Sequence, residues 1–288
     1  MNRLNKLLLC LLLLVSTSVF SQSIGIRPSQ IERIKVPVSV KHPGISRVRG
    51  YRVAHSDVPQ AFSGFRIAFV SDLHYPSKFT RKTLASLTRL LRNLHPDLLL
   101  LGGDYQENCE VVSELFDSLA AVHPPYGIAG VLGNNDYERC TDEIRIKMQA
   151  LGMHLLEHDT LCIRKEGQSI VIAGVRDPFN LSKNGASPVL MCDSTEFAIL
   201  LTHTPDYVEE VNNATADLAL AGHTHGGQVR ILGYTPKIPS RYGTRFRSGL
   251  KYSSQGVPIL ITNGIGTSEK SIRIGAPSEV LLIELHPL

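Results

Sequence analysis

The hydrophobic positions of the chain form short apolar runs that begin at residue 65 and recur to the C-terminus. Each run is bounded by Gly, Asn, Asp, Pro or another polar residue, as buried strands are. The runs predict strands at 65–70, 97–101, 127–132, 169–175, 197–202, 217–221, 258–262 and 279–285.

A helical pattern separates the first two runs. Residues 80–95 place four leucines at helical spacing behind Thr80, a suitable N-cap. Segments 110–121, 141–151 and 205–213 predict further helices. Strands that alternate with helices predict an α/β domain around a buried sheet.

The N-terminus has a different composition. Residues 1–22 combine a basic start with an apolar run of at most 14 residues, the anatomy of a secretory signal peptide. A membrane-spanning helix needs about 20, so a retained anchor is the less favoured alternative. Residues 23–62 predict an N-terminal extension, either an extended arm or an edge strand, and residues 63–288 predict one catalytic domain.

Composition limits the classes of function. With 43% hydrophobic and 19% charged residues, the chain has enough apolar side chains for a sizeable core. The net charge of +4 falls to +2 without Arg3 and Lys6 of the N-terminal segment. A charge this small predicts no general affinity for nucleic acid.

Potential metal ligands follow five of the predicted strands. In chain order they are Asp72, His74, Asp104, Asn134, His203, His223 and His225. Taken singly, each motif has a simpler interpretation, such as a helix cap, a surface imidazole or a tight turn. Five motifs in the same phase favour one shared site, because open α/β sheets bind ligands at the carboxyl ends of their strands.

The types of donor narrow the chemistry. Two carboxylates, one amide and four imidazoles without a thiolate suit Mn, Fe or Zn better than calcium. Seven ligands exceed the needs of one tetrahedral ion. Two ions that share a carboxylate, roughly 3.5–4 Å apart, would use them all, and this separation suits phosphoryl chemistry.

The ordered motifs DLH, GGD, GNND, a single His in LLTHTPD and GHTHGGQ resemble those of the calcineurin-like metallophosphoesterases. Further segments, among them FSGFRIAFVSDLH, HPDLLLLGGDY and NGIGTSEKSIRIGAPSEVLLIEL, resemble a bacterial exported or membrane-associated branch that includes UDP-2,3-diacylglucosamine pyrophosphatases. The resemblance covers residues 60–287. It implies a two-sheet β-sandwich flanked by helices, a four-layer αββα fold, and for this branch a role in lipid A biosynthesis.

The same resemblance implies a ligand assignment. Asp72, His74 and His225 would hold one ion, Asn134, His203 and His223 a second, and Asp104 would bridge them. A hydroxide held by the metals would attack phosphorus in line, so that no covalent nucleophile is needed.

The sequence departs from the family pattern at Asn135, where most relatives carry His. Residues 133–136 predict a turn, since Gly, Asn and Asp tolerate left-handed backbone angles. An amide at 135 can donate a hydrogen bond to the leaving group but cannot deliver a proton. The substitution favours diesters or pyrophosphates with stabilised leaving groups over monoesters.

Four cysteines follow the signal segment, without the CxxC pairs of structural zinc sites. Two interpretations remain open. In an oxidising compartment some pair, and Cys109 and Cys140 are the favoured couple because each lies just beyond a ligand motif. Alternatively all four, including Cys162 and Cys192, are free and partly buried.

Residues Arg230 to Lys251 carry six basic and no acidic side chains, interleaved with aromatic residues. One interpretation is a loop that contacts substrate phosphate or an anionic membrane surface. The other is a solvated loop that happens to be basic.

Together these features predict an exported, periplasmic or membrane-associated enzyme with two divalent metal ions. Its substrate would be a small-molecule or lipid-linked phosphodiester or pyrophosphate, such as a glycolipid or nucleotide-sugar lipid. The alternative is a metal-binding pseudoenzyme that recognises phosphorylated envelope ligands. A metallo-β-lactamase type of hydrolase also uses His-x-His, but the early Asp72, His74 and Asp104 set has no place in it.

Overall fold

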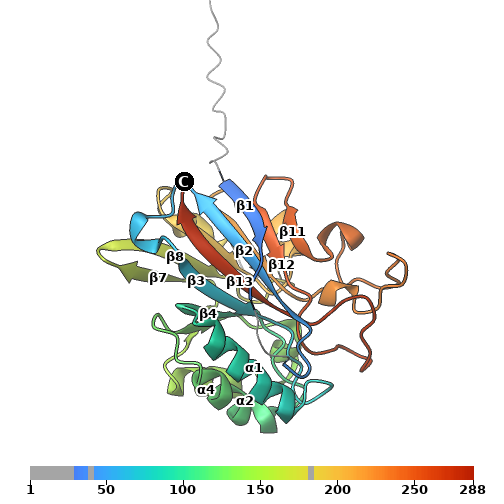
Figure 1. The fold of residues 1–288 in the computed structure, drawn as a ribbon. Coiled ribbons are helices and arrows are strands. Elements are labelled where there is room, and N and C mark those ends of the chain that lie inside the picture. Colours follow the sequence, from blue (N-terminus) through green and yellow to red (C-terminus); the bar gives the residue numbers. More distant parts are fainter. Residues whose placement is uncertain (1–28, 38–41, 181–184) are drawn as a thin grey trace, which may run out of the picture.

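The computed structural model describes residues 29–37, 42–180 and 185–288. The described strands form two mixed sheets with helices on their outer faces, which confirms the predicted α/β two-sheet sandwich (Figure 1). The predicted signal peptide at residues 1–22 lies outside the described residues and stays a prediction. Within the described ranges, no helix is both long and apolar enough to cross a membrane.

The first sheet has seven strands in the order β1-β2-β13-β3-β4-β5-β6. Their bounds are β1 Ser29–Ile34, β2 Arg47–His55, β3 Phe65–Val70, β4 Leu98–Leu101, β5 Ile128–Gly130, β6 His154–Leu155 and β13 Glu279–Pro287. Strands β3 to β6 run parallel, whereas β13 is antiparallel to β3 and parallel to β2.

The second sheet has six strands in the order β11-β12-β10-β9-β8-β7. Their bounds are β7 Asp159–Lys165, β8 Gln168–Gly174, β9 Phe197–Leu201, β10 Leu218–Ala221, β11 Gly249–Tyr252 and β12 Pro258–Ile261. The four inner strands are parallel, and the edge strands β7 and β11 are antiparallel to them.

The helices are α1 Arg81–Leu94, α2 Val112–Ala120, α3 Asn134–Arg139, α4 Thr141–Ala150 and α6 Asp206–Glu210. Short 3₁₀ turns lie at η1 Gln60–Phe62, η2 Cys109–Val111, η3 Pro188–Met191, η4 His225–Gly227 and η5 Gly243–Phe246. The cap prediction for α1 is confirmed, since Thr80 accepts a hydrogen bond from Thr83 N. Helix α6 ends earlier than predicted because Val211 is extended.

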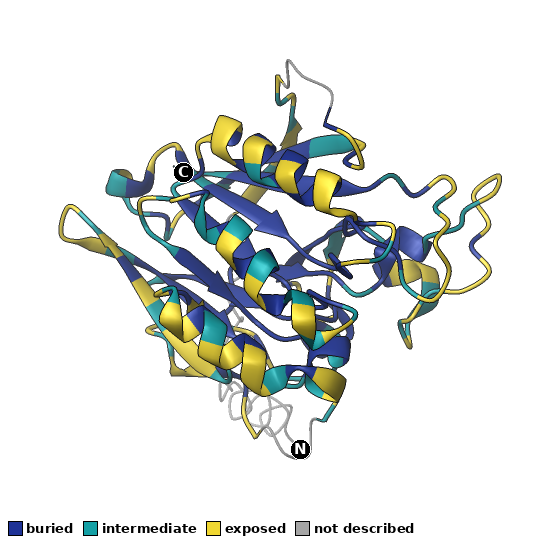
Figure 2. Ribbon diagram, turned by 90° about the horizontal axis from the view of Figure 1, so that it is seen from below, coloured by how far each residue is buried: buried dark blue, intermediate teal, exposed yellow. Residues whose placement is uncertain are grey.

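The cores explain why the strands are apolar on both faces. In β3, Ala68 and Val70 face α1, α2 and α4, whereas Ile67 and Phe69 face the second sheet. Strands β9 and β10 likewise place larger side chains between the sheets and mainly small ones, such as Ala198, on the outer face. Figure 2 shows the buried strands beneath helices whose outward sides are exposed. The two sheets therefore share one core, which fixes their relative position.

The N-terminal extension is part of the first sheet. Strand β1 is an edge strand, one of its two predicted forms, and β2 lies between β1 and β13. Glu279 at the start of β13 is fully buried and forms ion pairs with Arg47 and Arg49 of β2, with N–O distances of 2.6 and 3.0 Å. The domain boundary at residue 62 stays a prediction.

A disulfide joins Cys109 to Cys140, and Cys162 and Cys192 are free. Of the two interpretations of the cysteines, the structure therefore selects pairing, and it joins the favoured couple. The bond connects the first residue of η2 to Cys140, the residue that follows α3.

Candidate metal centre

The structure brings six of the seven predicted metal ligands into two adjacent clusters. One consists of Asp72, His74 and His225, the other of Asp104, His203 and His223, and within each cluster the ligand atoms lie within 4.8 Å of one another. Asp104 faces both clusters, because its Oδ2 lies 3.5 Å from His74 Nε2 and 3.3 Å from His203 Nε2.

Both sheets contribute to the clusters because the carboxyl ends of their parallel strands meet. Nδ1 of His203, which follows β9, lies 2.7 Å from the carbonyl oxygen of Gly102, which follows β4. The backbone N–H of His223, beyond β10, donates to Asp72 Oδ1 at 3.0 Å. The site thus lies between the two sheets, and the loops that form it are anchored by the ends of buried strands.

The backbone of these loops is unusual for non-glycine residues. Five residues of the clusters have φ between 47° and 65°: Asp72, His74, Asp104, His223 and His225. Left-handed angles of this kind persist only where the surrounding structure holds them, and they gather at functional sites. Gly133 packs closely against Asp104. A Cβ atom at position 133 would overlap the Asp104 carboxylate.

Hydrogen bonds at Nδ1 orient two of the imidazoles. His203 donates from Nδ1 to the carbonyl oxygen of Gly102, which leaves Nε2 directed at Asp104. His74 Nδ1 lies 2.7 Å from Glu107 Oε1, and its Nε2 faces Asp104 and His225. Such outer partners fix the tautomer and ring orientation of metal-ligating histidines. Sequence reasoning missed Glu107, which belongs to none of the ligand motifs.

Arg273 packs behind His225. Its guanidinium donates to the carbonyl oxygens of His225 and Asn263, at 3.2 and 2.7 Å, and lies 3.3 Å from His225 Nδ1. Burial lowers the pKa of Arg273 to about 10. The sequence gave no indication of this contact, because His225 and Arg273 are 48 residues apart in the chain.

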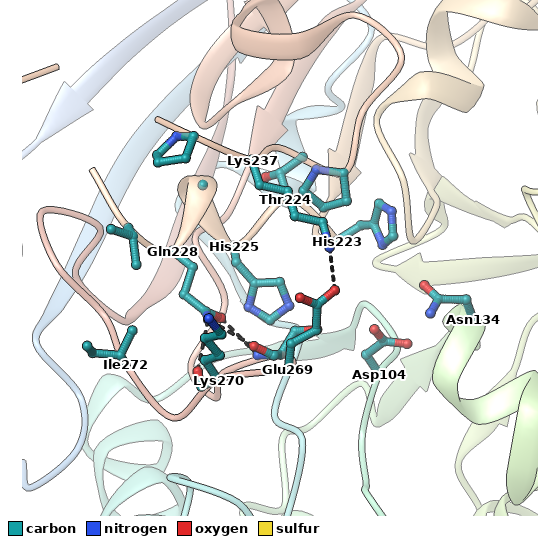
Figure 3. A pocket seen from close by; sticks show the side chains of 15 residues that line it. Asp104, Asn134, His223, Thr224, His225, Gln228, Lys237, Glu269, Lys270 and Ile272 are labelled. Carbon is teal, nitrogen blue, oxygen red and sulfur yellow. Dashed lines mark hydrogen bonds and ion pairs between the residues drawn. The ribbon is translucent and has the colours of Figure 1, made fainter. Parts of the chain in front are cut away.

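Asn134 begins α3 instead of lying in a turn, because Gly133 is extended and caps the helix. Its Oδ1 is buried without a hydrogen-bond partner among the described residues, and the side chain lines a cavity together with Asp104 and His223 (Figure 3). An unpaired buried amide oxygen is costly. It fits a ligand for a hard or borderline cation in this cavity.

Asn135 is placed differently from the expectation. It is buried, it is not among the residues that line the cavity, and its side-chain amide donates to the carbonyl oxygen of Gln106. Its backbone N–H donates to Asp104 Oδ1 at 2.9 Å. In this conformation Asn135 orients the Asp104 carboxylate, and its predicted catalytic role stays a prediction.

Asp136 connects the start of α3 to the loop that follows β4 and carries Asp104. Its carboxylate accepts hydrogen bonds from the backbone N–H groups of Gly133, Asp104 and Tyr105 at 2.7–3.0 Å. Burial and the nearby charge of Asp104 raise the pKa of Asp136 to about 7. Asp136 is part of the GNND motif, but the sequence gave no indication that its carboxylate accepts hydrogen bonds from backbone N–H groups.

The electrostatics of the site centre on Asp104. Burial alone would raise its pKa, but His203, His74 and His223 hold that pKa below its ordinary value. Burial also opposes charge on His203, yet Asp104 and Asp72 raise the pKa of His203 to about 10. A buried carboxylate of this kind needs a positive partner, which is the electrostatic condition for binding a cation.

The cavity over the clusters has a volume of about 500 Å³. Figure 3 shows Asp104 and Asn134 on one side of the cavity and Gln228, Lys270 and Ile272 on the far wall. The lining also includes His223, His225, Val229, Pro236, Lys237 and Glu269. Gln228 fixes this wall, since its side-chain amide donates to the carbonyl oxygens of Ser268 and Lys270. The cavity joins the clusters to a wall that carries two lysines.

Three of the six basic residues in segment 230–251 pair with acidic residues from elsewhere in the chain. Arg241 and Arg245 form ion pairs with Glu210 and Glu209 of α6 at 3.0 and 2.8 Å. Lys237 pairs with Glu269 across the cavity wall. The sequence could not reveal these partners, because they lie outside the segment.

Comparison with known proteins gives consistent results. The family model for calcineurin-like phosphoesterase matches residues 65–227. The chain is 25% identical over 249 residues to the uncharacterized metallophosphoesterase YkuE of Bacillus subtilis, covering 84% of this chain and 86% of that protein. It is 28% identical over 230 residues to the phosphodiesterase YaeI of Escherichia coli, covering 77% and 82%. Among solved structures, a 5'-nucleotidase precursor from Thermus thermophilus aligns with a TM-score of 0.45 and 13% identity, covering 76% of this chain and 54% of that one.

Proposed function

The chain belongs to the calcineurin-like phosphoesterase family, and from this premise we propose that it binds two divalent metal ions and hydrolyses phosphodiester or pyrophosphate bonds. The observation that carries the proposal is the pair of ligand clusters with the Asp104 carboxylate between them. Such an arrangement fits two ions that share one ligand.

The donor atoms fit this pair of ions. Asp72, His74 and His225 would hold one, Asn134, His203 and His223 the other, and Asp104 both. Carboxylate, amide and imidazole donors suit Mn, Fe or Zn. When bound, such ions supply Lewis-acid stabilisation of phosphoryl charge and activate a water for attack.

The remaining chemistry falls to groups of the chain itself. The backbone N–H of Asn135 and the loop held by Asp136 aim the Asp104 carboxylate. Lys270, which lines the cavity and forms no ion pair among the described residues, is placed to attract an anionic substrate. Because Asp104, Asn135 and Asp136 are buried, the exclusion of water strengthens the electrostatic interactions among them.

We propose phosphodiesters or pyrophosphates as substrates because Asn135 cannot protonate a departing oxygen. The relative YaeI, which is named a phosphodiesterase, supports this preference. A glycolipid or nucleotide-sugar lipid of the bacterial envelope is the substrate class we propose. The predicted signal peptide and the Cys109–Cys140 disulfide support the proposed export.

The direct test is turnover by protein stripped with a chelator and reloaded with Mn²⁺. We expect hydrolysis of an aryl phosphodiester to depend on the added metal and to exceed hydrolysis of the matching aryl phosphomonoester. Absence of turnover, in protein shown by elemental analysis to contain metal, would contradict the enzymatic proposal.

The second candidate function is a pseudoenzyme that binds phosphorylated ligands. The observation that favours it is the Asn135 amide, which donates to Gln106 instead of facing the cavity. Asn135→His discriminates between the two. For an active diesterase we expect a modest change in leaving-group preference. Wild-type turnover that cannot be distinguished from the assay background, with turnover about 10²- to 10⁴-fold above that background in Asn135→His, would support the pseudoenzyme.

A further inference from the structure

Two exposed loops lie side by side beyond the far cavity wall. One is the segment 228–235 and the other is 268–276, drawn in orange and dark red at the right of Figure 1. Arg230 N donates to the carbonyl oxygen of Ile274 at 2.7 Å, and Ile274 N donates to that of Gln228 at 2.9 Å. These backbone bonds join the loops into one surface.

The tips of these loops are apolar. We define the apolar rim as Ile231, Leu232, Tyr234, Ile272 and Ile274. Leu232 is fully exposed, and Tyr234 is 71% exposed. Single exposed apolar residues are ordinary, but a contiguous group of them marks a site of interaction with a protein or a membrane.

The apolar rim is continuous with the candidate site. Val229 and Pro236 line the cavity, and the exposed residues 231–234 lie between these two points of the lining in the chain. Ile272 belongs both to the cavity wall and to the rim. Whatever covers the rim therefore lies at the mouth of the cavity.

The charges beside the rim identify its partner. Arg230 and Lys270 form no ion pair with an acidic side chain among the described residues, in contrast to Arg241 and Arg245, which α6 neutralises. Unpaired cations around exposed aliphatic and aromatic side chains are complementary to an anionic lipid surface. A protein partner of ordinary composition would not require this combination.

We propose that the apolar rim docks on an anionic lipid membrane. Leu232, Ile231 and Tyr234 enter the interface, while Arg230 and Lys270 contact lipid headgroups. Contact with the membrane thus involves these two loops and not the whole basic segment 230–251. Docking in this way also directs the cavity mouth toward lipid headgroups. The functional meaning of this orientation rests on the proposed phosphoesterase function.

The chain contains no tryptophan, so one introduced indole reports on one position. We would place it with Leu232→Trp and, as a matched control, with Ile146→Trp, because Ile146 is 67% exposed on α4 and outside both loops. The probes are vesicles of phosphatidylcholine alone and vesicles with about one third phosphatidylglycerol. This readout is local, so it does not depend on whether residues 1–22 are retained.

We expect the emission of Leu232→Trp to shift to shorter wavelength with the anionic vesicles, and that of Ile146→Trp to stay unchanged. Adding Arg230→Gln to Leu232→Trp should weaken binding about fivefold, since one basic residue near an anionic surface contributes about 1 kcal/mol. No shift in Leu232→Trp, or an equal shift in Ile146→Trp, overturns the proposal.

Hydrolysis of a water-soluble aryl phosphodiester without vesicles separates this proposal from the enzymatic one. Turnover without an emission shift would remove the docking surface and leave the proposed function. An emission shift without turnover would do the reverse.

Discussion

Asp104→Asn is expected to lower turnover of an aryl phosphodiester at least about a thousandfold, because in the proposed site Asp104 would hold both ions, which supply several kcal/mol of transition-state stabilisation. The Asp104 carboxylate contacts a histidine of each cluster, since its Oδ2 lies 3.5 Å from His74 Nε2 and 3.3 Å from His203 Nε2. An asparagine keeps one acceptor oxygen and loses the negative charge that His74 and His203 now contact. Steady-state kinetics and metal content per chain, measured on the same sample, are the readouts.

The matched control is Asp142→Asn. Asp142 is 84% exposed and pairs with Arg145 on the surface of α4, an interaction worth under about 1 kcal/mol. This variant should keep both its metal and its rate. If Asp104→Asn kept its metal and rate as well, the bridging assignment would be wrong.

Removing the disulfide is expected to lower the free energy of unfolding substantially. The bond between Cys109 and Cys140 spans a sequence separation of 31, and for a closed loop of this size the chain-entropy model predicts about 4 kcal/mol. We therefore expect Cys109→Ala/Cys140→Ala to lower the free energy of unfolding by about this amount. Urea unfolding of the variant and of the reduced wild-type protein measures it.

Cys162→Ala is the control, since Cys162 is free and exposed. It should change the free energy of unfolding by less than about 0.5 kcal/mol. An unchanged urea midpoint for the double variant would show that the bond contributes little to the folded state. Metal affinity of the double variant is a separate readout. A lower affinity would show that the disulfide keeps the loops of Asp104 and Asn134 in place.

The fold was predictable wherever the pattern of apolar residues is local. All eight apolar runs form strands, and the leucine spacing behind Thr80 forms α1. Strand β7 was missed because it is an edge strand with mostly exposed or half-buried side chains, so only its pairing with β8 defines it. Helix α3 was taken for a turn because its six residues contain no apolar period.

The candidate site was predictable as a set of residues and not as an arrangement. The ligand types follow directly from motifs at strand ends, but the direction of Asn135 depends on the carbonyl oxygen of Gln106, which approaches it only in the folded chain. Glu107 and Arg273 support His74 and His225 from outside the motifs. The pairing of Arg241 and Arg245 with α6 likewise appears only when distant segments meet.

By itself the sequence determined which donors are present and that each follows a buried strand within a few residues, since strand periodicity and ligand chemistry are properties of short segments. Only the tertiary structure decided that Asp104 contacts histidines of both clusters, that the Asn135 amide donates to Gln106 and is not part of the cavity lining, and that the unpaired cations lie beside the apolar rim. The physical reason is that these features depend on contacts between residues far apart in the chain. Such contacts also hold Asp72, His74 and Asp104 at left-handed angles that the residues would not adopt alone.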